Sequence, residues 1–435
     1  MPTPLYDCLK NYAAGNPARF HMPGHKGAFL PGPEFSALAP LDVTEITPTG
    51  NLFQAGEPFD SAQQLWADLF GFDLCQFLTG GSTMGIHTAL ALLCRPGDKL
   101  LVDRGCHRAV FNAMALLDLE PVFLERPWLT EENQTGPFTA QQVEQALEAH
   151  PECKTVCITS PTYSGLLSDI PNISRAIHAR GGKLFVDGAH GAHLPFLGIK
   201  KPFAGADVVV VSAHKTLPAL GQTALLFVNG MDHDRVRRAA SIYGSSSPSY
   251  PMLASMDLAR QWLLDHPGEY ERAVNWVARL REEFPSLGGY PLDPARLTIR
   301  VKNGPELAQK LEGCGIFPEM EDGGHVVFIC TAMDSEESFL RLERALEGLR
   351  GELGRCDPLP PPPMPERVLS PRQALFAPQE GRPLSDCLGR VAACQLAPYP
   401  PGIPVVAPGE RIGKKELSYF MQIGYNDQDV ALVRE

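Results

Sequence analysis

Residues 61–228 alternate between helix-like and strand-like segments, and this alternation limits the possible folds more than any other feature of the sequence. The strand-like segments are short, apolar and rich in β-branched residues. They are Cys75–Thr79, Lys99–Arg104, Pro121–Glu125, Thr155–Pro161, Lys183–Ala189, Asp207–Ala213 and Thr223–Val228, and the amphipathic stretches between them include Ser61–Phe70, Met84–Cys94 and Thr139–Ala149. This order predicts an α/β fold whose mostly parallel seven-stranded sheet is covered by helices on both faces.

The pattern changes beyond residue 230. One long helical stretch over 257–283, strands at Arg296–Lys302 and His325–Thr331 and a helix over Ser335–Leu349 predict a smaller α/β domain. Four consecutive prolines at 360–363 indicate an extended connector. The first 60 residues are rich in proline and glycine and carry no strong periodicity. We therefore expect an N-terminal arm at 1–60, a large domain at 61–230, a small domain at 231–357, a linker at 358–365 and a C-terminal domain at 366–435.

The charge balance and the cysteines narrow the class of ligand and the compartment. The chain has 38 basic and 50 acidic residues, a formal net charge of −12, and no basic block, so we expect neither nucleic acid nor a membrane surface as a partner. Its apolar runs are much shorter than the roughly 18 residues that span a bilayer, and its start lacks the pattern of a signal peptide. Eleven scattered cysteines without a Cys-x-x-Cys pair predict free thiols, not structural zinc. A cytoplasmic protein with a small-molecule ligand is the expectation.

Polar residues gather where the predicted strands end, which is the edge where open parallel sheets bind ligands. The segments are Thr79–Gly85 after the first strand, Asp103–His107 after the second, Ser160–Gly165 after the fourth, Asp187–His193 after the fifth and Ser212–Lys215 after the sixth. In the first of these, small residues and hydroxyls precede a helix, so its free N–H groups favour an anion such as phosphate. An ordinary helix cap explains that turn equally well.

Asp187 and Lys215 are the most informative of these residues. A carboxylate or an amine behind a buried strand is costly to desolvate unless it meets a partner or has a chemical role. Pyridoxal phosphate would use both, because its aldehyde needs a lysine, its ring nitrogen an acid and its phosphate N–H and hydroxyl donors. The alternatives are structural: an ion pair of Asp187 with Lys215, an ordinary helix start at His107, and capping or packing by Thr162 and Tyr163. We expect no metal, since His190, His193 and His214 lack the His-Glu-x-x-His pattern.

Taken together, the motifs of the chain resemble the Orn/Lys/Arg decarboxylase family. The matching segments, in the family's order, are Arg19–Gly27, Asp42–Ile46, Gly81–Thr83, Cys106–His107, Ser160–Tyr163, Asp187 with Ala189–His193, Ser212–Pro218, Leu396–Pro404 and Pro408–Glu410. They cover nearly the whole chain. Its length is similar to that of the compact members, which lack the N-terminal receiver-like domain of the long enzymes.

The resemblance implies an aspartate-aminotransferase-like fold, fold type I, with pyridoxal phosphate bound by a homodimer or a larger homo-oligomer. It also implies a role for each matching residue. Lys215 would hold the cofactor covalently, and its phosphate would be contacted by Ser82, Thr83, Ser212 and His214. His107 would stack on the cofactor ring, Ala189 would pack against the ring, and Asp187 would pair with the pyridine nitrogen. His190 would lie close to cofactor and substrate.

The activity implied is decarboxylation of arginine, lysine or ornithine to an amine and carbon dioxide, the chemistry of polyamine biosynthesis. Lys215, Asp187 and His190 would be the catalytic residues, with His190 or Lys215 as the proton donor. Glu45 and Glu410 are the candidates for binding the substrate's distal cation. The alternatives are another fold type I reaction, transamination or a lyase reaction, and a binding homologue that has lost activity.

Several positions depart from the family pattern. Glycine stands at 80 and 105 where asparagine is usual, and at 188 where glutamate is frequent. Residues 49–53 read Thr-Gly-Asn-Leu-Phe where acidic residues and a histidine are common. None of these positions is Lys215 or Asp187, so the cofactor chemistry is not affected. The missing acidic residues concern the site for the substrate's distal cation, because a basic side chain needs a carboxylate partner.

Overall fold

A computed structural model describes residues 2–199, 201–398, 404–425 and 429–434. Part of the expected C-terminal motif, residues 399–403, lies outside them. The chain forms two compact units, which are described separately below. The first comprises Met1–Leu92, Phe185–Arg272 and Thr331–Met333, and the second Leu93–Leu184, Ala273–Cys330 and Asp334–Glu435. The domain limits expected from the sequence remain predictions.

The seven predicted strands form one sheet in the order β1-β9-β8-β7-β6-β2-β3. The strands are β1 Leu74–Leu78, β2 Lys99–Asp103, β3 Glu120–Leu124, β6 Thr155–Thr159, β7 Lys183–Asp187, β8 Val208–Ser212 and β9 Ala224–Val228. The pairs β7–β8, β2–β6 and β2–β3 are parallel, whereas β9 runs antiparallel to both of its neighbours. The expected mostly parallel sheet is confirmed. Every residue of β8 and β9 is buried, as their continuous apolar sequences predict.

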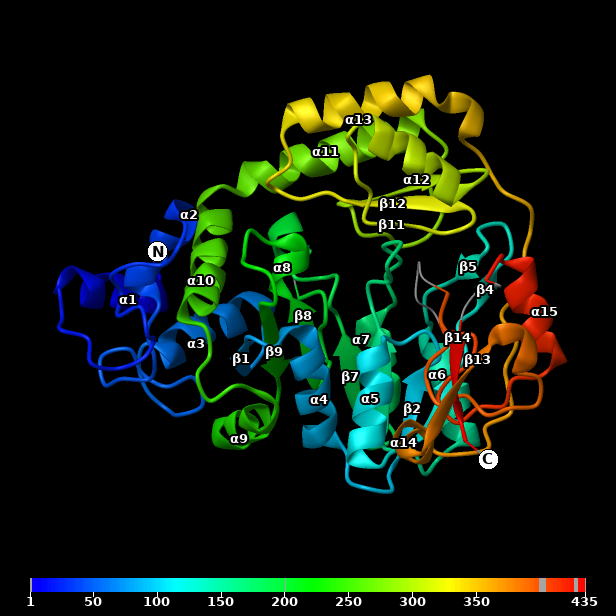
Figure 1. Ribbon diagram of the computed structural model, residues 1–435, viewed down its shortest axis with the longest axis horizontal. Helices are drawn as coiled ribbons and strands as arrows, with labels where there is room; N and C mark the ends of the chain where they lie inside the picture. The colour runs from blue at the N-terminus through cyan, green and yellow to red at the C-terminus, as the bar shows by residue number, and fades with distance from the viewer. Residues whose placement is uncertain (1, 200, 399–403, 426–428, 435) are drawn as a thin grey trace. The chain divides into compact units, whose positions relative to one another are not determined.

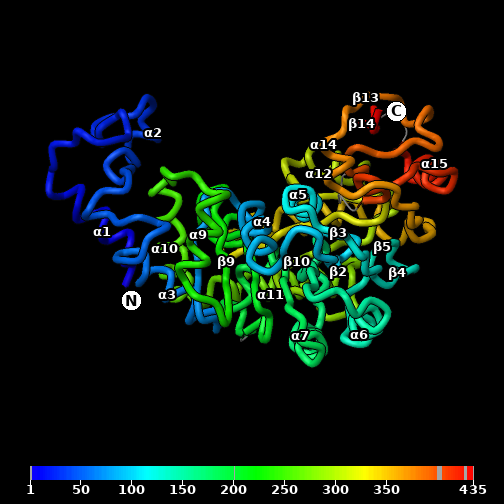
Figure 2. The backbone as a smooth tube through the Cα atoms, turned by 90° about the horizontal axis from the view of Figure 1, so that it is seen from below, coloured from blue at the N-terminus to red at the C-terminus, as the bar shows by residue number. Residues whose placement is uncertain are grey.

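The first unit contributes β1, β8, β9 and the end of β7 to this sheet, and it also contains helices. They are α1 Pro4–Ala14, α2 Pro33–Ser36, the 3₁₀ turns η1 Ala39–Leu41 and η2 Leu194–Leu197, α3 Phe59–Phe70, α4 Gly81–Leu93, α8 Ala213–Thr216, α9 His233–Tyr243 and α10 Tyr250–Asp265. The helix α1 is absent from the sequence-based expectation. It lies beside α10 (Figures 1 and 2), where the buried carboxylate of Asp257 accepts the N–H groups of Leu5 at 3.0 Å and Tyr6 at 3.2 Å. A carboxylate at a helix N-terminus satisfies donors that have no partner within the helix.

The predicted continuous helix over 257–283 is wrong. The chain instead forms α10, which ends at Asp265, and α11, Pro267–Glu283. Proline carries no N–H and disfavours helical geometry in the residue before it, so Pro267 ends the first helix and begins the second.

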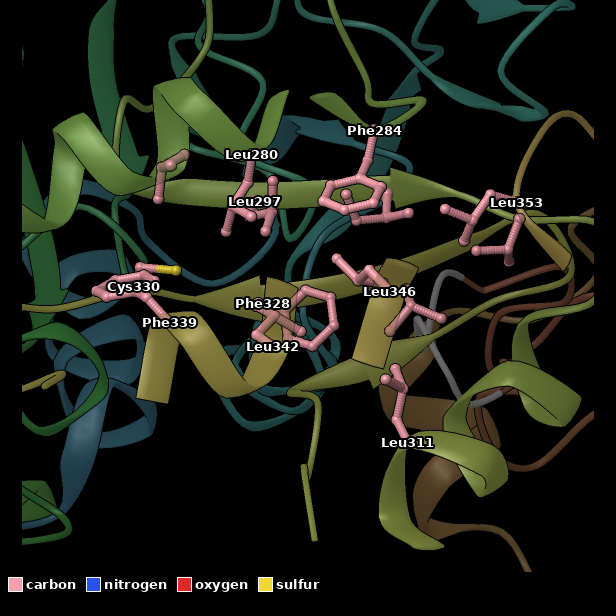
Figure 3. Packing of buried hydrophobic residues seen from close by; sticks show 14 of the residues in the cluster. Leu280, Phe284, Leu297, Leu311, Phe328, Cys330, Phe339, Leu342, Leu346 and Leu353 are labelled. Atoms are coloured by element: carbon pink, nitrogen blue, oxygen red, sulfur yellow. The ribbon is translucent and has the colours of Figure 1, made fainter. Parts of the chain in front are cut away.

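The second unit contains α5 Arg108–Leu117, α6 Ala140–Ala149, α7 Ile170–His178 and the small hairpin of β4 Trp128–Leu129 and β5 Gln134–Thr135. It also holds a three-stranded sheet in the order β10-β12-β11, formed by Arg296–Arg300, His325–Ile329 and Met320–Glu321, together with α12 Gly304–Gly313, α13 Glu336–Gly348 and η3 Arg350–Glu352. Figure 3 shows the apolar core between these strands and helices, with Leu280 from α11, Phe284 directly after that helix, Leu297 from β10, Phe328 from β12 and Leu342 from α13.

The C-terminal segment of the second unit has a core of its own. Its elements are α14 Pro371–Phe376, β13 Gln379–Pro383, η4 Leu384–Asp386, α15 Lys414–Gln422 and β14 Asp429–Val433, and β13 pairs antiparallel with β14 (Figure 1). Leu384, Val406, Ile412, Phe420 and Leu432 are buried together there. The stretch 358–365 forms neither helix nor strand. Among the described residues, no helix combines the length and the apolar character needed to cross a lipid bilayer.

Candidate active site

The turn between β1 and α4 presents a helix N-terminus at the end of a buried strand. Gly81 begins α4 with φ +67°, a left-handed conformation that glycine adopts without strain, and its N–H donates to the carbonyl oxygen of Gln222 at 2.8 Å. Further along the helix, a Cβ on Gly85 would lie 2.3 Å from Cγ2 of Val210, so only glycine allows α4 to pack this closely against β8. Ser82 and Thr83 lie in the first turn of this 13-residue helix, where backbone N–H groups have no partner within the helix.

The loop after β7 is buried and held to the neighbouring strand. Gly188 N–H donates to the carbonyl oxygen of Val210 at 2.9 Å, and the backbone of Ala189 accepts from Ser212. The carboxylate of Asp187, at the end of β7, is 2% exposed and accepts the N–H of Ala189 at 3.2 Å. A Cβ on Gly188 would lie 2.9 Å from the ring of Phe203, so the glycine at this position accommodates that ring.

The turn after β8 carries the predicted lysine. Nζ of Lys215 lies 3.1 Å from Nε2 of His190, which comes from the loop after β7. On the same turn, Nδ1 of His214 donates to the carbonyl oxygen of Thr223 at 2.8 Å, which fixes the orientation of that ring. The structure thus brings Lys215 and His190 into contact from the ends of two adjacent strands. His190 lies three residues after Asp187 in the sequence.

One buried hydroxyl tests whether this part of the first unit suits a phosphorylated cofactor. Oγ of Ser212 is fully buried and has no hydrogen-bond partner among the described residues. An unpaired buried hydroxyl is costly, and a ligand oxygen is a natural partner for it. With the α4 N-terminus and the amine of Lys215, the donor set fits pyridoxal phosphate.

Glu45, a predicted substrate residue in the first unit, has one engaged and one unengaged carboxylate oxygen. Oγ1 of Thr44 donates to Oε2, whereas Oε1 is buried without a hydrogen-bond partner among the described residues. The loop around it is fixed, since Oγ1 of Thr49 donates to the Thr44 carbonyl at 2.7 Å and the hydroxyl of Tyr250 to the Gly50 carbonyl at 2.6 Å. The free oxygen is suited to accept a hydrogen bond from a cation.

In the second unit, His107 is the N-cap of α5. Its Nδ1 accepts the N–H of Ala109 at 3.2 Å, so the ring closes the helix end and is held in one orientation. The capping role that the sequence allowed for His107 is therefore present. Ring stacking on a cofactor stays a prediction.

Glu410, the other predicted substrate residue, forms a buried ion pair with Arg104. Nη1 of Arg104 donates to Oε1 at 2.9 Å and Nη2 to Oε2 at 2.7 Å, while Ala407 N–H donates to Oε2 at 2.7 Å. Burial raises the pKa of Glu410, and the Arg104 guanidinium counteracts that rise. At 1% exposure and with both oxygens engaged, this carboxylate does not fit the expected contact with a substrate cation.

Two arginines in this region were missed from the sequence. One is Arg104, described above. The other is Arg126, which follows β3 and donates to the buried carboxylate of Asp103 through Nε at 3.0 Å and Nη2 at 2.6 Å. Asp103 also accepts the N–H of Gly105 at 2.8 Å. The argument applied to Lys215, that a charged side chain behind a buried strand needs a partner, applies equally to these arginines and would have found them.

Comparison with solved structures identifies the class of the fold. The crystal structure of a lysine decarboxylase from Francisella novicida superposes with a TM-score of 0.84 and 20% identity, over 99% of this chain and 81% of that one. The expected fold is therefore confirmed.

More particularly, the chain belongs to the Orn/Lys/Arg decarboxylase family. Residues 3–303 match the model of that family's major domain and 362–429 the model of its C-terminal domain. The uncharacterized protein YaaO of Bacillus subtilis is 33% identical over 97% of this chain and 94% of its own. An arginine decarboxylase of the same organism is 30% identical over 97% and 93%. The family and the class of activity expected from the sequence are confirmed.

Proposed function

We propose that this enzyme uses pyridoxal phosphate to decarboxylate a basic amino acid, with arginine as the first of arginine, lysine and ornithine to be tested. The observation that carries the proposal is the pair of Lys215 Nζ and His190 Nε2, 3.1 Å apart at the carboxyl ends of two adjacent strands. Arginine comes first because an arginine decarboxylase is similar over nearly the whole chain. The amine product is of the kind that polyamine biosynthesis consumes.

The cofactor, when bound, would supply an electron sink for the pair left at Cα as carbon dioxide departs. Lys215 would hold it covalently, and Ser82, Thr83, Ser212 and His214 would bind its phosphate. Two observations support that assignment: the buried hydroxyl of Ser212 has no hydrogen-bond partner among the described residues, and Ser82 and Thr83 lie in the first turn of α4, where anions are commonly bound. Ala189 would pack against the ring and His107 would stack on it, as the resemblance implies.

Asp187 would keep the pyridine nitrogen protonated. A buried carboxylate stabilises a cation beside it far more than one in water does, and Asp187 is 2% exposed. Its position is fixed by the N–H of Ala189, so the carboxylate is already oriented before a ligand binds.

The contact of His190 with Lys215 supports a role in proton transfer. A proton must reach Cα after carbon dioxide leaves, and both side chains carry a nitrogen that can deliver it. Their separation is that of a hydrogen bond, so a proton held on one nitrogen can pass to the other. We assign the proton donor to this pair.

Glu45 is the proposed partner of the substrate's distal cation. Its unengaged Oε1 supports the role, because a guanidinium or ammonium group would complete the hydrogen bonding of a buried carboxylate oxygen. Glu410 does not share this role, since Arg104 occupies its carboxylate.

A homodimer or larger homo-oligomer is proposed on the basis of the N-terminal arm. Its segment between α1 and α3 exposes large apolar side chains, with Phe20 95% exposed and Phe29, Phe35 and Met22 each more than half exposed. Large apolar side chains that are exposed close together in the sequence fit an association surface. We propose the cytoplasm as its location, since cysteines scattered through the sequence without a Cys-x-x-Cys pair are typical of a reducing compartment.

The decisive experiment is mass spectrometry of the products formed from an equal mixture of arginine, lysine and ornithine. The enzyme is supplied with pyridoxal phosphate, and Lys215→Ala serves as the control. We expect agmatine as the main product, and no amine from the variant. Keto acids in place of amines would show another fold type I reaction, and absence of any product with cofactor bound would overturn the proposed activity.

A further inference from the structure

The turn that carries His107 is fixed from two sides by buried ion pairs. It runs from Asp103, the last residue of β2, to Arg108, the first of α5. Asp103 accepts the N–H of Gly105 at 2.8 Å through Oδ1, and its carbonyl oxygen accepts the N–H of Cys106 at 3.1 Å. Arg126 binds the same carboxylate, so this side of the turn is fixed within the sheet.

The other side of the turn is held by the C-terminal segment. Arg104 extends to Glu410 with two hydrogen bonds of 2.9 and 2.7 Å, and its Nη2 also donates to the carbonyl oxygen of Val405 at 2.9 Å. Its guanidinium lies 4.5 Å from the centre of the Phe123 ring. A bidentate contact with a planar guanidinium fixes distance and orientation together, which a single charge contact cannot do.

Glu410 is itself held in place. Its Oε2 accepts the N–H of Ala407 at 2.7 Å, and its backbone pairs with Ala392, whose N–H donates to the Glu410 carbonyl oxygen at 2.9 Å. The side chains of Arg104 and Glu410 are 9% and 1% exposed. Loss of either charge would leave its partner buried and uncompensated, so the pair is expected to resist separation.

We infer that Glu410 is a positioning residue for His107: through Arg104, the C-terminal segment holds the turn at 103–107 so that the His107 ring has one orientation. The Ala109 N–H bond to Nδ1 of His107 fixes the ring relative to α5, and the Arg104–Glu410 pair fixes the start of that helix relative to the C-terminal core. The inference rests on the proposed function, in which His107 stacks on the cofactor ring. It explains why a buried carboxylate lies at a position that the family resemblance made a candidate for binding substrate.

The test is a double-mutant cycle on cofactor binding in the full-length enzyme. Glu410→Gln keeps the shape of the side chain and removes its charge, and His107→Ala removes the ring. We expect Glu410→Gln to weaken pyridoxal phosphate binding about tenfold and to reduce the visible circular dichroism of the bound cofactor. In the His107→Ala background, Glu410→Gln should produce no further loss of affinity.

Glu366→Gln is the matched control. Glu366 lies in the same segment and pairs with Arg411 at 3.2 Å, but both side chains are exposed, so cofactor binding should equal that of the wild type. Should Glu410→Gln fail to fold, Arg104→Lys carries the same test, because it keeps the charge and loses the bidentate contact.

The inference would be overturned if the two losses of cofactor affinity, from Glu410→Gln and from His107→Ala, multiplied in the double variant. Such a result would show that Glu410 acts independently of the ring. A folded Glu410→Gln enzyme with unchanged affinity and dichroism would overturn it too. Failure of the proposed function looks different: the wild-type enzyme itself would then bind no pyridoxal phosphate or produce no amine.

Discussion

Nζ of Lys215 lies within hydrogen-bond distance of Nε2 of His190, at 3.1 Å. The two residues follow adjacent parallel strands, β8 and β7, which are paired in register from Phe185 with Val208 to Asp187 with Val210. Their contact therefore depends on a sheet register set by apolar residues, not on a flexible loop. This geometry is the basis for the first two predictions.

Lys215 should be the residue that carries the cofactor covalently. Borohydride reduction of the wild-type enzyme loaded with pyridoxal phosphate should add the mass of the reduced cofactor to the peptide that contains Lys215. Lys215→Ala should show no such peptide and should lose at least about 1,000-fold in turnover, because Lys215 supplies the amine held beside His190. Lys99→Ala, which removes an exposed lysine, is the control and should retain the modification. Modification of another lysine in wild-type protein would refute the assignment.

His190 should act on protons and leave covalent attachment intact. We expect His190→Gln to lower kcat by about 100-fold or more, the range typical of a lost general acid, while the reduced adduct on Lys215 still forms. Steady-state kinetics and peptide mass spectrometry on the same preparation measure both effects. His150→Gln, which changes a histidine with a 44% exposed side chain, should leave kcat unchanged. Equal kcat values for His190→Gln and the wild type would exclude His190 from proton transfer.

The strands of the large sheet were predictable because a strand that is buried on both faces requires a short, continuous run of apolar residues, and such a run is typical of parallel sheets covered by helices. All seven observed strands start within one residue of the predicted position, as β8 illustrates: Val208–Ser212 against an expected start at Asp207. The polar residues after these strands were also found, since the rule that ligands bind at the carboxyl ends of strands requires no tertiary information.

Contacts between residues distant in sequence were not predictable in the same way. Arg104 and Glu410 are 306 positions apart, and no local pattern connects them. Glu410 was therefore assigned by resemblance to a substrate role, whereas its actual partner is an arginine of the same chain. The helix α1 was missed for a related reason: only Leu5 and Leu9 of it are buried, and its N-terminus is stabilised by Asp257, more than 250 residues away.

A buried ion-pair network in the second unit should make stability depend on pH. His325 lies 3.1 Å from Asp322 and 3.7 Å from Glu132, and Glu132 binds Arg300 through two hydrogen bonds of 2.6 and 2.7 Å. Although burial alone would lower it, hydrogen bonds to Asp322 and Glu132 raise the pKa of His325 to about 9. The network lies between the β4–β5 hairpin and the β10–β12 sheet.

A raised pKa in the folded state means that protonated His325 stabilises the fold below its ordinary pKa of 6.5, and that this contribution is lost as pH rises through about 9. The free energy of unfolding should therefore decrease between pH 7 and 10, by at most about 3 kcal/mol. In His325→Gln that decrease should be absent. Denaturant unfolding at several pH values measures it, with His266→Gln, an exposed histidine on the other unit, as the control. An unchanged slope in His325→Gln would contradict the role of the network.

Glu45 should determine recognition of the substrate's basic end. Glu45→Gln keeps the bond from Thr44 possible but removes the charge that would meet a guanidinium or ammonium group at Oε1. We expect kcat/KM for the preferred basic substrate to fall about 100-fold, mostly through KM, because the lost contact is a charge-assisted hydrogen bond in a buried position. Affinity for pyridoxal phosphate, measured by fluorescence titration, should not change. Glu57→Gln, which alters an exposed carboxylate bonded to Ser61 on the same segment, should keep wild-type values of both. If Glu45→Gln lowered cofactor affinity and left KM unchanged, the residue would belong to the cofactor site and the distal cation would need another partner.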